Sequence, residues 1–78
     1  MDWRGRIISD TEILAGKPVV KGTRLSVEFL LGLFASGWSE EDVLQNYPRL
    51  EKQDIQAVFA FAQDGLKDGL LFESRVSL

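Results

Sequence analysis

The carboxylates Glu40, Glu41 and Asp42 form the densest group of residues that could perform acid–base chemistry or bind a metal. They directly follow Ser39, a good helix N-cap, so they also suit the first turn of a helix, where negative charge offsets the helix dipole. We favour this second interpretation. The chain contains no Cys and no His, which excludes disulfides, Cys/His zinc sites and His-based catalytic triads. The sequence therefore predicts a protein that is not an enzyme and holds no cofactor or metal.

Basic residues are concentrated at the N-terminal end, although the net charge of the chain is −3. Residues 1–24 hold five basic and three acidic groups (+2), and residues 25–78 hold four and nine (−5). An acidic total argues against general affinity for nucleic acid, which needs several cations facing phosphates. A local basic patch still makes operator DNA a possible partner. The candidate DNA contacts are Arg6, Lys17, Lys21, Arg24, Lys52, Gln53 and Gln56.

The first third of the chain favours a small β element. Short β-branched runs between turn-forming residues predict two strands within residues 6–20, separated by a loop over residues 10–17. Gly22 follows the second strand and suits a turn that requires positive φ. The chain is short enough to be a single domain, residues 1–78.

The remainder predicts three helices, at about residues 26–35, 40–46 and 52–64, and Ser26 is a good N-cap for the first of them. Apolar residues recur at helical spacing in the first and third of these segments. Gly65 and Gly69 are expected to end the third helix, which leaves residues 66–78 as a C-terminal arm. The predicted fold is therefore mostly α, a three-helix bundle of helix-turn-helix type with a short N-terminal β element.

The third predicted helix permits two interpretations. Its position after a short helix and a turn is that of a recognition helix, and Gln and Lys can contact base edges. However, Glu51 and Asp54 flank the candidate contacts and would repel phosphate, so a plain bundle without a DNA-binding role is favoured over this reading. For the function of the whole chain, these two interpretations correspond to a stand-alone DNA-binding regulator and to a structural dimerisation module, and both stay open as alternatives.

Association with other proteins is expected because a domain of this size buries only about 60% of its unfolded surface. The third helix is apolar on two faces, which predicts a homodimer with Ala57 and Phe61 at the interface. The apolar run in the C-terminal arm predicts a surface for another protein. Its candidate contacts are Leu70, Leu71, Phe72 and Arg75. The longest nearly apolar run, residues 29–35, is too short to cross a membrane, and a cytoplasmic location is expected.

Two segments resemble a known bacterial family, domain of unknown function 433. The run from Ile13 to Leu25 is similar to its signature, Ile-Leu-Gly-Gly-Lys-Pro-Val-Ile-Lys-Gly-Thr-Arg. The segment from Gly37 to Ile55 resembles the family's Gly-x-Ser-x-Glu and Tyr-Pro-x-Leu motifs. Ala15 stands where the family has Gly, Ser26 where it has Pro, and Glu51-Lys52 where it has Thr-Pro.

The resemblance implies a VapB-like antitoxin with a helix-turn-helix type of fold. Such an antitoxin is the non-catalytic half of a bacterial type II toxin–antitoxin pair, which binds and inhibits a PIN-like ribonuclease toxin. It also implies possible binding to the operator of its own genes. Because Glu51 is a poor N-cap, the departure at Glu51-Lys52 predicts fraying at the start of the third helix.

Overall fold

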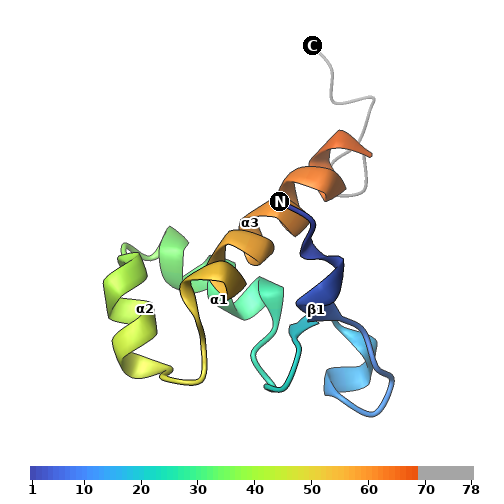
Figure 1. Ribbon diagram of the computed structural model, residues 1–78, viewed down its shortest axis with the longest axis horizontal. Coiled ribbons are helices and arrows are strands. Elements are labelled where there is room, and N and C mark those ends of the chain that lie inside the picture. Colours follow the sequence, from blue (N-terminus) through green and yellow to red (C-terminus); the bar gives the residue numbers. More distant parts are fainter. Residues whose placement is uncertain (69–78) are drawn as a thin grey trace.

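The computed structural model describes residues 1–68 and contains three α-helices and a two-stranded sheet (Figure 1). The helices are α1 (Val27–Ala35), α2 (Glu40–Asn46) and α3 (Lys52–Lys67). The strands are β1 (Ile7–Ile8) and β2 (Val19–Val20). Two short 3-10 helices, η1 (Trp3–Gly5) and η2 (Leu14–Gly16), precede the strands. The predicted mostly-α fold with an N-terminal β element is confirmed.

The two strands are antiparallel, and Ile7 pairs with Val20 while Ile8 pairs with Val19. The opposite edge of β2 forms a bridge between Val19 and Ser26, which brings the start of α1 against the sheet. The Ser26 hydroxyl accepts a hydrogen bond from the backbone N–H of Phe29 at 2.9 Å. Ser26 therefore serves as the N-cap of α1, as predicted, although the family has Pro at this position.

Helix α1 ends in a Schellman motif around Gly37, whose φ is +100°. The N–H of Gly37 bonds to the carbonyl of Phe34, and the N–H of Trp38 bonds to that of Leu33. Helix α2 then begins with a reciprocal pair of bonds between Ser39 and Asp42, at 2.9 and 3.0 Å. The Ser39 backbone N–H, and then its hydroxyl, hold the pKa of Asp42 below its ordinary value. Asp42 is therefore a capping residue, and Glu40 and Glu41 lie with it in the first turn of α2.

Helix α3 is longer than predicted, because Gly65 lies inside it and the helix continues to Lys67. A glycine inside a helix costs about 1 kcal/mol relative to alanine, so Gly65 weakens α3 without ending it. Residues 66 and 67 therefore belong to the helix and not to an arm. The candidate contacts at Leu70, Leu71, Phe72 and Arg75 lie outside the described residues.

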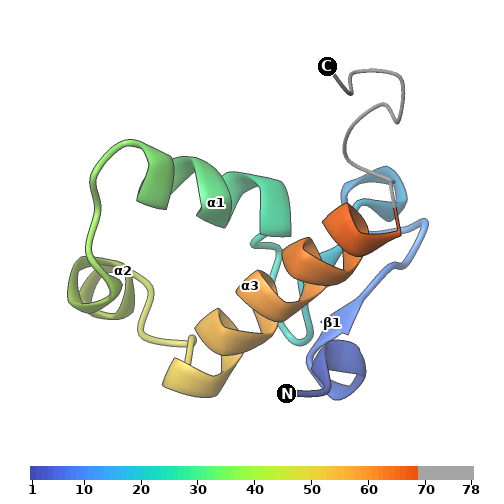
Figure 2. The same cartoon turned by 90° about the horizontal axis from the view of Figure 1, so that it is seen from above.

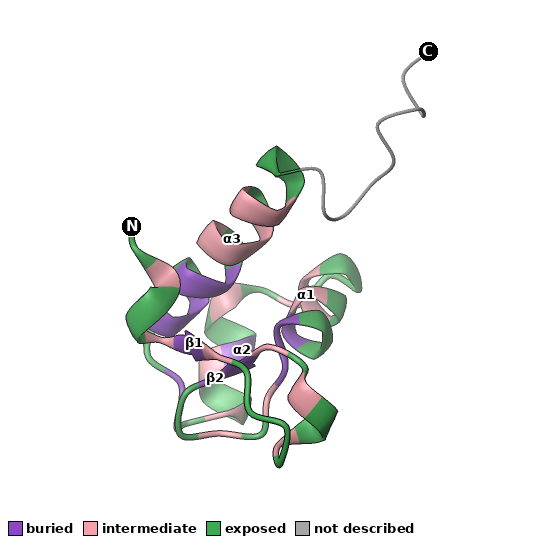
Figure 3. Cartoon of the chain, turned by 90° about the vertical axis from the view of Figure 1, so that its right-hand side faces the viewer, coloured by how far each residue is buried: buried purple, intermediate pink, exposed green. Residues whose placement is uncertain are grey.

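The core lies where α3 crosses the sheet and the start of α1 (Figure 3). Seen from above, α1 and α2 lie on one side of α3, while β1 and η1 lie on the other (Figure 2). The C-terminal half of α3 projects beyond the body, and its residues there are half-buried or exposed. The buried apolar side chains are Ile7, Val19, Val20, Val27, Leu30, Val43, Leu50, Ile55, Ala57 and Val58.

The loop between the strands contains a strained turn in place of the plain loop that was expected. Leu14 and Ala15 both have positive φ, at 51° and 57°, and Gly16 follows at 87°. A left-handed conformation costs an L-residue about 1–2 kcal/mol. The glycine that the family signature has at the position of Ala15 would remove part of this strain.

Candidate functional site

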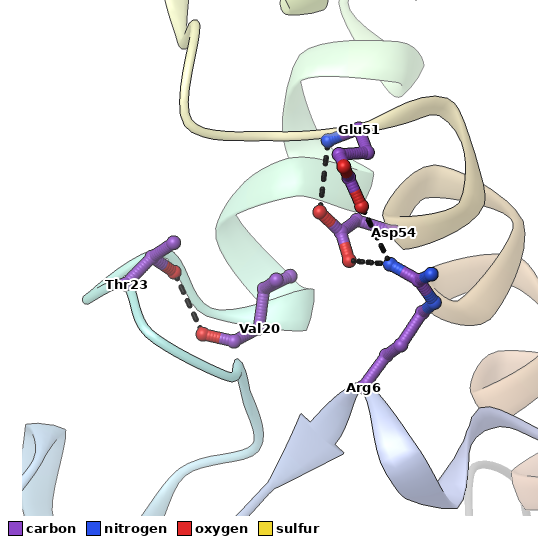
Figure 4. A network of polar contacts seen from close by, with 5 residues as sticks. All are labelled: Arg6, Val20, Thr23, Glu51 and Asp54. Atoms are coloured by element: carbon purple, nitrogen blue, oxygen red, sulfur yellow. Dashed lines mark hydrogen bonds and ion pairs between the residues drawn. The ribbon is translucent and has the colours of Figure 1, made fainter.

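An ion-pair network joins β1 to the start of α3 (Figure 4). The Nη1 atom of Arg6 donates to Asp54 Oδ1 at 2.9 Å and to Glu51 Oε1 at 3.1 Å. The other oxygen of the Asp54 carboxylate accepts from the backbone N–H of Glu51 at 2.8 Å. The carboxylates of Asp54 and then Glu51 raise the pKa of Arg6 above its ordinary value. Asp54 thus supplies the capping hydrogen bond at the start of α3, where Glu51 was expected to be a poor cap.

This network changes the roles expected for three charged residues. Arg6 was a candidate phosphate contact, but its guanidinium group is held by two carboxylates of its own chain. In turn, Glu51 and Asp54 were expected to repel phosphate, and Arg6 offsets their charge. The basic patch predicted from residues 1–24 therefore loses one member, and the start of α3 loses part of its acidic character.

The turn between β2 and α1 is fixed by Thr23. Its hydroxyl donates to the carbonyl of Val20 at 2.8 Å and accepts from the N–H of Leu25 at 3.0 Å. Gly22 has φ of +84°, as expected for the turn. Its carbonyl accepts a bond from Arg49 Nη1 at 3.2 Å, across 27 positions of sequence. Arg49 follows Pro48 in the turn between α2 and α3, and sequence reasoning did not select it.

The candidate DNA contacts do not form one surface. Arg6 and Lys21 line a shallow hollow of about 490 Å³, together with Arg49 and three carboxylates, those of Asp2, Glu51 and Asp54. Lys17 lies elsewhere and pairs with Glu28 of α1 at 3.3 Å. The remaining candidates Arg24, Lys52, Gln53 and Gln56 are exposed. Lys52 shares a hollow with Glu40 and Glu41, so carboxylates lie near this cation as well.

A groove of about 400 Å³ between α1 and the C-terminal half of α3 has a mostly apolar lining. Val27 is buried at 5% exposure, while Leu31, Phe61 and Ala62 are half-buried around it. Pro18 and Glu28 complete the lining. The groove joins segments that are far apart in the sequence, which is why helical periodicity alone does not reveal it.

The predicted dimer contacts have a different role in the structure. Ala57 has an exposed fraction of 0% within one chain, so its assignment to a dimer interface is wrong. It packs in the core because it lies on the side of α3 that faces the sheet. Phe61 is half-buried and packs edge-on against Trp3, with 4.7 Å between ring centroids. The Trp3 indole N–H donates to Asp64 at 2.6 Å and secures this contact.

Residues 1–68 contain no cluster of three metal-ligating side chains and no helix that is long and apolar enough to cross a membrane. In the same residues, every buried side-chain nitrogen or oxygen has a hydrogen-bond partner. The prominent surface features of this part of the chain are the apolar groove, the exposed side of α3 and the hollow where Lys21, from the turn after β2, lies with Arg49, from the turn before α3.

Comparison with known proteins identifies relatives of this fold. Residues 7–62 match the family DUF433, described as protein of unknown function. Uncharacterized protein y4eO of Sinorhizobium fredii is 35% identical over 57 residues, which are 73% of this chain and 26% of that protein. The crystal structure of a DUF433 member from Anabaena variabilis has a TM-score of 0.75 at 22% identity, and covers 81% of this chain and 62% of its own. The chain thus spans about a quarter of its curated relative, and on the extent of the family match it belongs to the DUF433 family.

Proposed function

We propose that this domain is the non-catalytic antitoxin of a bacterial type II toxin–antitoxin pair, and that it binds and inhibits a PIN-like ribonuclease in the cytoplasm. The observation that carries the proposal is the apolar groove between α1 and α3. Small molecules and anchoring side chains bind preferentially in apolar concavities of this kind. The resemblance of the signature segment to VapB-like antitoxins supplies the class of the partner.

The groove suits an apolar anchor from another protein. Val27, the first residue of α1 after the N-cap, lines the groove and is buried in the core cluster. The walls of the groove come from Leu31 on one helix and from Phe61 and Ala62 on the other. The edge-on contact with Trp3 holds the Phe61 ring in place. A preformed apolar pocket of this kind binds with little loss of conformational entropy.

Substitution of Leu31 by Arg tests this proposal. The guanidinium group would enter the groove, so affinity for the nuclease encoded by the adjacent gene should fall by about 30- to 1000-fold, the range for an interface hot spot. Affinity is measured by isothermal titration, and inhibition by cleavage of a fluorescent RNA. Gln45→Arg, which adds the same charge on the exposed side of α2, should bind like the wild type.

Circular dichroism must show that Leu31→Arg remains folded, and Ala62→Arg provides a second variant from the opposite wall. If both variants are folded and inhibit the nuclease as strongly as the wild type, the groove is not the binding surface. If the wild type neither binds nor inhibits the nuclease, the antitoxin assignment itself is wrong.

A second candidate function is operator DNA binding. The ion-pair network removes part of the negative charge at the start of α3, which was the argument from sequence against DNA binding. Arg6 offsets the two carboxylates at the start of α3, where Lys52, Gln53 and Gln56 are exposed. Bidentate contacts from Gln to adenine would read bases there. Lys21 and Arg49 come from two different turns, line one hollow next to this end of α3, and would contact phosphates.

For this second function, a gel-shift titration on the promoter of the domain's own gene should separate phosphate contacts from base contacts. Arg49→Glu should weaken binding and reduce the slope of log K against log salt by about 1. Gln56→Ala should weaken binding by about 1–3 kcal/mol without changing that slope. Lys17→Glu should have little effect, because Lys17 pairs with Glu28. Absence of any shift with wild-type protein, alone or with the nuclease, rules out this function.

A further inference from the structure

The chain leaves α3 on the side of that helix that carries the apolar groove. Successive residues of an α-helix are rotated by about 100°, so the C-cap Asp68 lies about 20° from Phe61 around the helix axis. In the same way, Leu66 lies about 40° from Ala62. Phe61 and Ala62 form the α3 wall of the groove. The residues that follow Asp68 in the sequence therefore start from the groove side of α3.

The surface between the groove and the end of α3 is apolar. Leu66 is 50% exposed and lies one turn beyond Ala62. Gly65 points between the directions of Phe61 and Ala62, one turn further along the helix, and has no side chain that projects there. This half of α3 projects beyond the body of the domain (Figure 3). A segment that ran back along this side of α3 would cover Leu66 before it reached the groove.

The sequence after α3 supplies an apolar segment of suitable length. Gly69 follows the C-cap, at the position where a glycine most often turns the chain at the end of a helix. Residues 70–72 read Leu-Leu-Phe and span about 10 Å when extended. The distance along the helix axis from Asp68 back to Ala62 is about 9 Å. Phe72 can therefore reach the height of the groove.

The charges of the segment and of the groove are complementary. Among the described residues that line the groove, Glu28 carries the charge. It pairs with Lys17 at 3.3 Å, but both side chains are mostly exposed, so this ion pair holds Glu28 weakly. Beyond Phe72 the sequence continues with one acidic residue, Glu73, and one basic residue, Arg75. Arg75 can approach Glu28 while Glu73 approaches Lys17.

The short connection to α3 favours this segment over a separate molecule. A segment that is joined to its site by a short linker has an effective concentration of about millimolar at that site. A free protein at micromolar concentration must bind much more tightly to occupy the same groove. The first occupant to consider is therefore the chain itself.

We propose that residues 70–75 fold back along α3, that Phe72 occupies the groove between α1 and α3, and that Arg75 pairs with Glu28. A nuclease that binds the groove must then displace this segment, which sequence reasoning had assigned to contacts with another protein. The docking of the segment is independent of the proposed function. Only its competition with a nuclease rests on that function.

The first experiment locates the segment with a spin label. The chain has no cysteine, so Ser74→Cys provides a single attachment point for a nitroxide in the full chain, enriched with nitrogen-15. The amide signals of Val27 and Leu31, which line the groove, should be lost by paramagnetic broadening. Trp3 should keep its signal. It contacts α3 at the same height, at Phe61, but belongs to η1 on the other side of the helix (Figure 2).

Two substitutions in the labelled chain test which side chain docks. Phe72→Ser should restore the signals of Val27 and Leu31, because the apolar anchor is lost. Val76→Ser is the matched control, since it removes an apolar side chain just beyond the proposed segment and should leave the broadening unchanged. The same spectra report whether each variant is folded.

The ion pair is tested by a charge exchange. Arg75→Glu should restore part of the Val27 signal, and the combination of Arg75→Glu with Glu28→Arg should remove it again. Recovery of the signal in the combined variant as well would overturn the pairing of Arg75 with Glu28.

A mixture of spin-labelled chain without nitrogen-15 and unlabelled chain with nitrogen-15 distinguishes the source of the segment. This mixture should show no broadening of Val27 or Leu31. Broadening there means that a second copy supplies the segment, and it overturns docking within one chain. In the singly labelled chain, docking is also overturned if Val27 and Leu31 are broadened no more than Trp3, or if Phe72→Ser leaves their broadening unchanged.

The consequence for the nuclease of the adjacent gene is measured separately, by isothermal titration. If the segment fills the groove about nine-tenths of the time, Phe72→Ser should raise the apparent affinity for the nuclease about tenfold. An unchanged or lower affinity overturns the competition, and a lower one makes the segment a contact of the nuclease instead. Failure of the wild type to bind the nuclease would overturn the proposed function, whereas the spin-label result would still decide the docking.

Discussion

Replacement of Ala57 by Glu is expected to abolish the cooperative unfolding transition of the domain. Ala57 has no exposed surface and lies in the core with Ile55 and Val58. A carboxylate there would lose its hydration without gaining a partner, at a cost of several kcal/mol. This approaches the total stability of a small domain, about 5–10 kcal/mol. Circular dichroism during thermal unfolding should therefore show a largely unfolded chain at 25 °C.

The control for this result is Gln56→Glu, which introduces the same side chain one position earlier on the same helix. Gln56 is exposed, so the variant should unfold within a few degrees of the wild type. A folded but monomeric Ala57→Glu protein would contradict the structure. It would place Ala57 on a dimer interface, as the sequence pattern suggested.

Asp54→Ala is expected to lower the free energy of unfolding by about 2 kcal/mol, and the melting temperature by on the order of 10 °C. The substitution removes the acceptor for the Glu51 N–H, which caps the first turn of α3. It also removes the shorter of the two ion pairs made by Arg6. Because α3 contacts both η1 and β1, loosening of its first turn should weaken the whole domain.

Two further variants identify the cause of this effect. Asp54→Asn keeps an acceptor for the Glu51 N–H but loses the charge, so its melting temperature should lie between those of Asp54→Ala and the wild type. Asp68→Ala removes a carboxylate from the exposed end of α3 and should change stability by less than about 0.5 kcal/mol. An unchanged melting temperature for Asp54→Ala would show that the network does not stabilise α3.

A double-mutant cycle with Arg6→Met tests the ion pair directly. If Arg6 and Asp54 act together, the double variant should lose less stability than the sum of the two single variants. The same cycle bears on DNA binding, because Arg6→Met leaves Glu51 and Asp54 without their cation. Operator binding, if present, should then weaken even though Arg6 touches no phosphate.

Local signals in the sequence were sufficient for most element boundaries. Ser26 and Ser39 were correctly predicted as N-caps, and the bounds of α2 were predicted to the residue, because capping depends on a few neighbouring groups. Gly22 was likewise placed in a turn with positive φ. Gly65 was misleading because a glycine only weakens a helix and does not terminate it.

The candidate surfaces were much less accessible to sequence reasoning. The expected basic patch is divided by ion pairs. Two of them join Arg6 to Glu51 and Asp54, which lie 45 and 48 positions later in the sequence. The groove exists only where α1 packs against α3. Likewise, Arg49 and Gly22 are hydrogen-bonded because folding brings together two turns that are 27 positions apart in the sequence. Such pairs carry no signature in a single sequence because their partners are far apart along it.

The sequence by itself determined the mostly-α fold, the N-terminal strands and the three helices, because periodicity, caps and turn residues act over a few positions. Tertiary structure decided which apolar side of α3 is buried. Ala57 and Phe59 both belong to apolar stripes, yet one has no exposure and the other is 45% exposed. The central run of α3 from Ala57 to Ala62 is apolar on every side of the helix, so it specifies no inward side of its own. That choice is made by the sheet, by α1 and by Trp3, which cover one side of α3 and leave the other open to solvent.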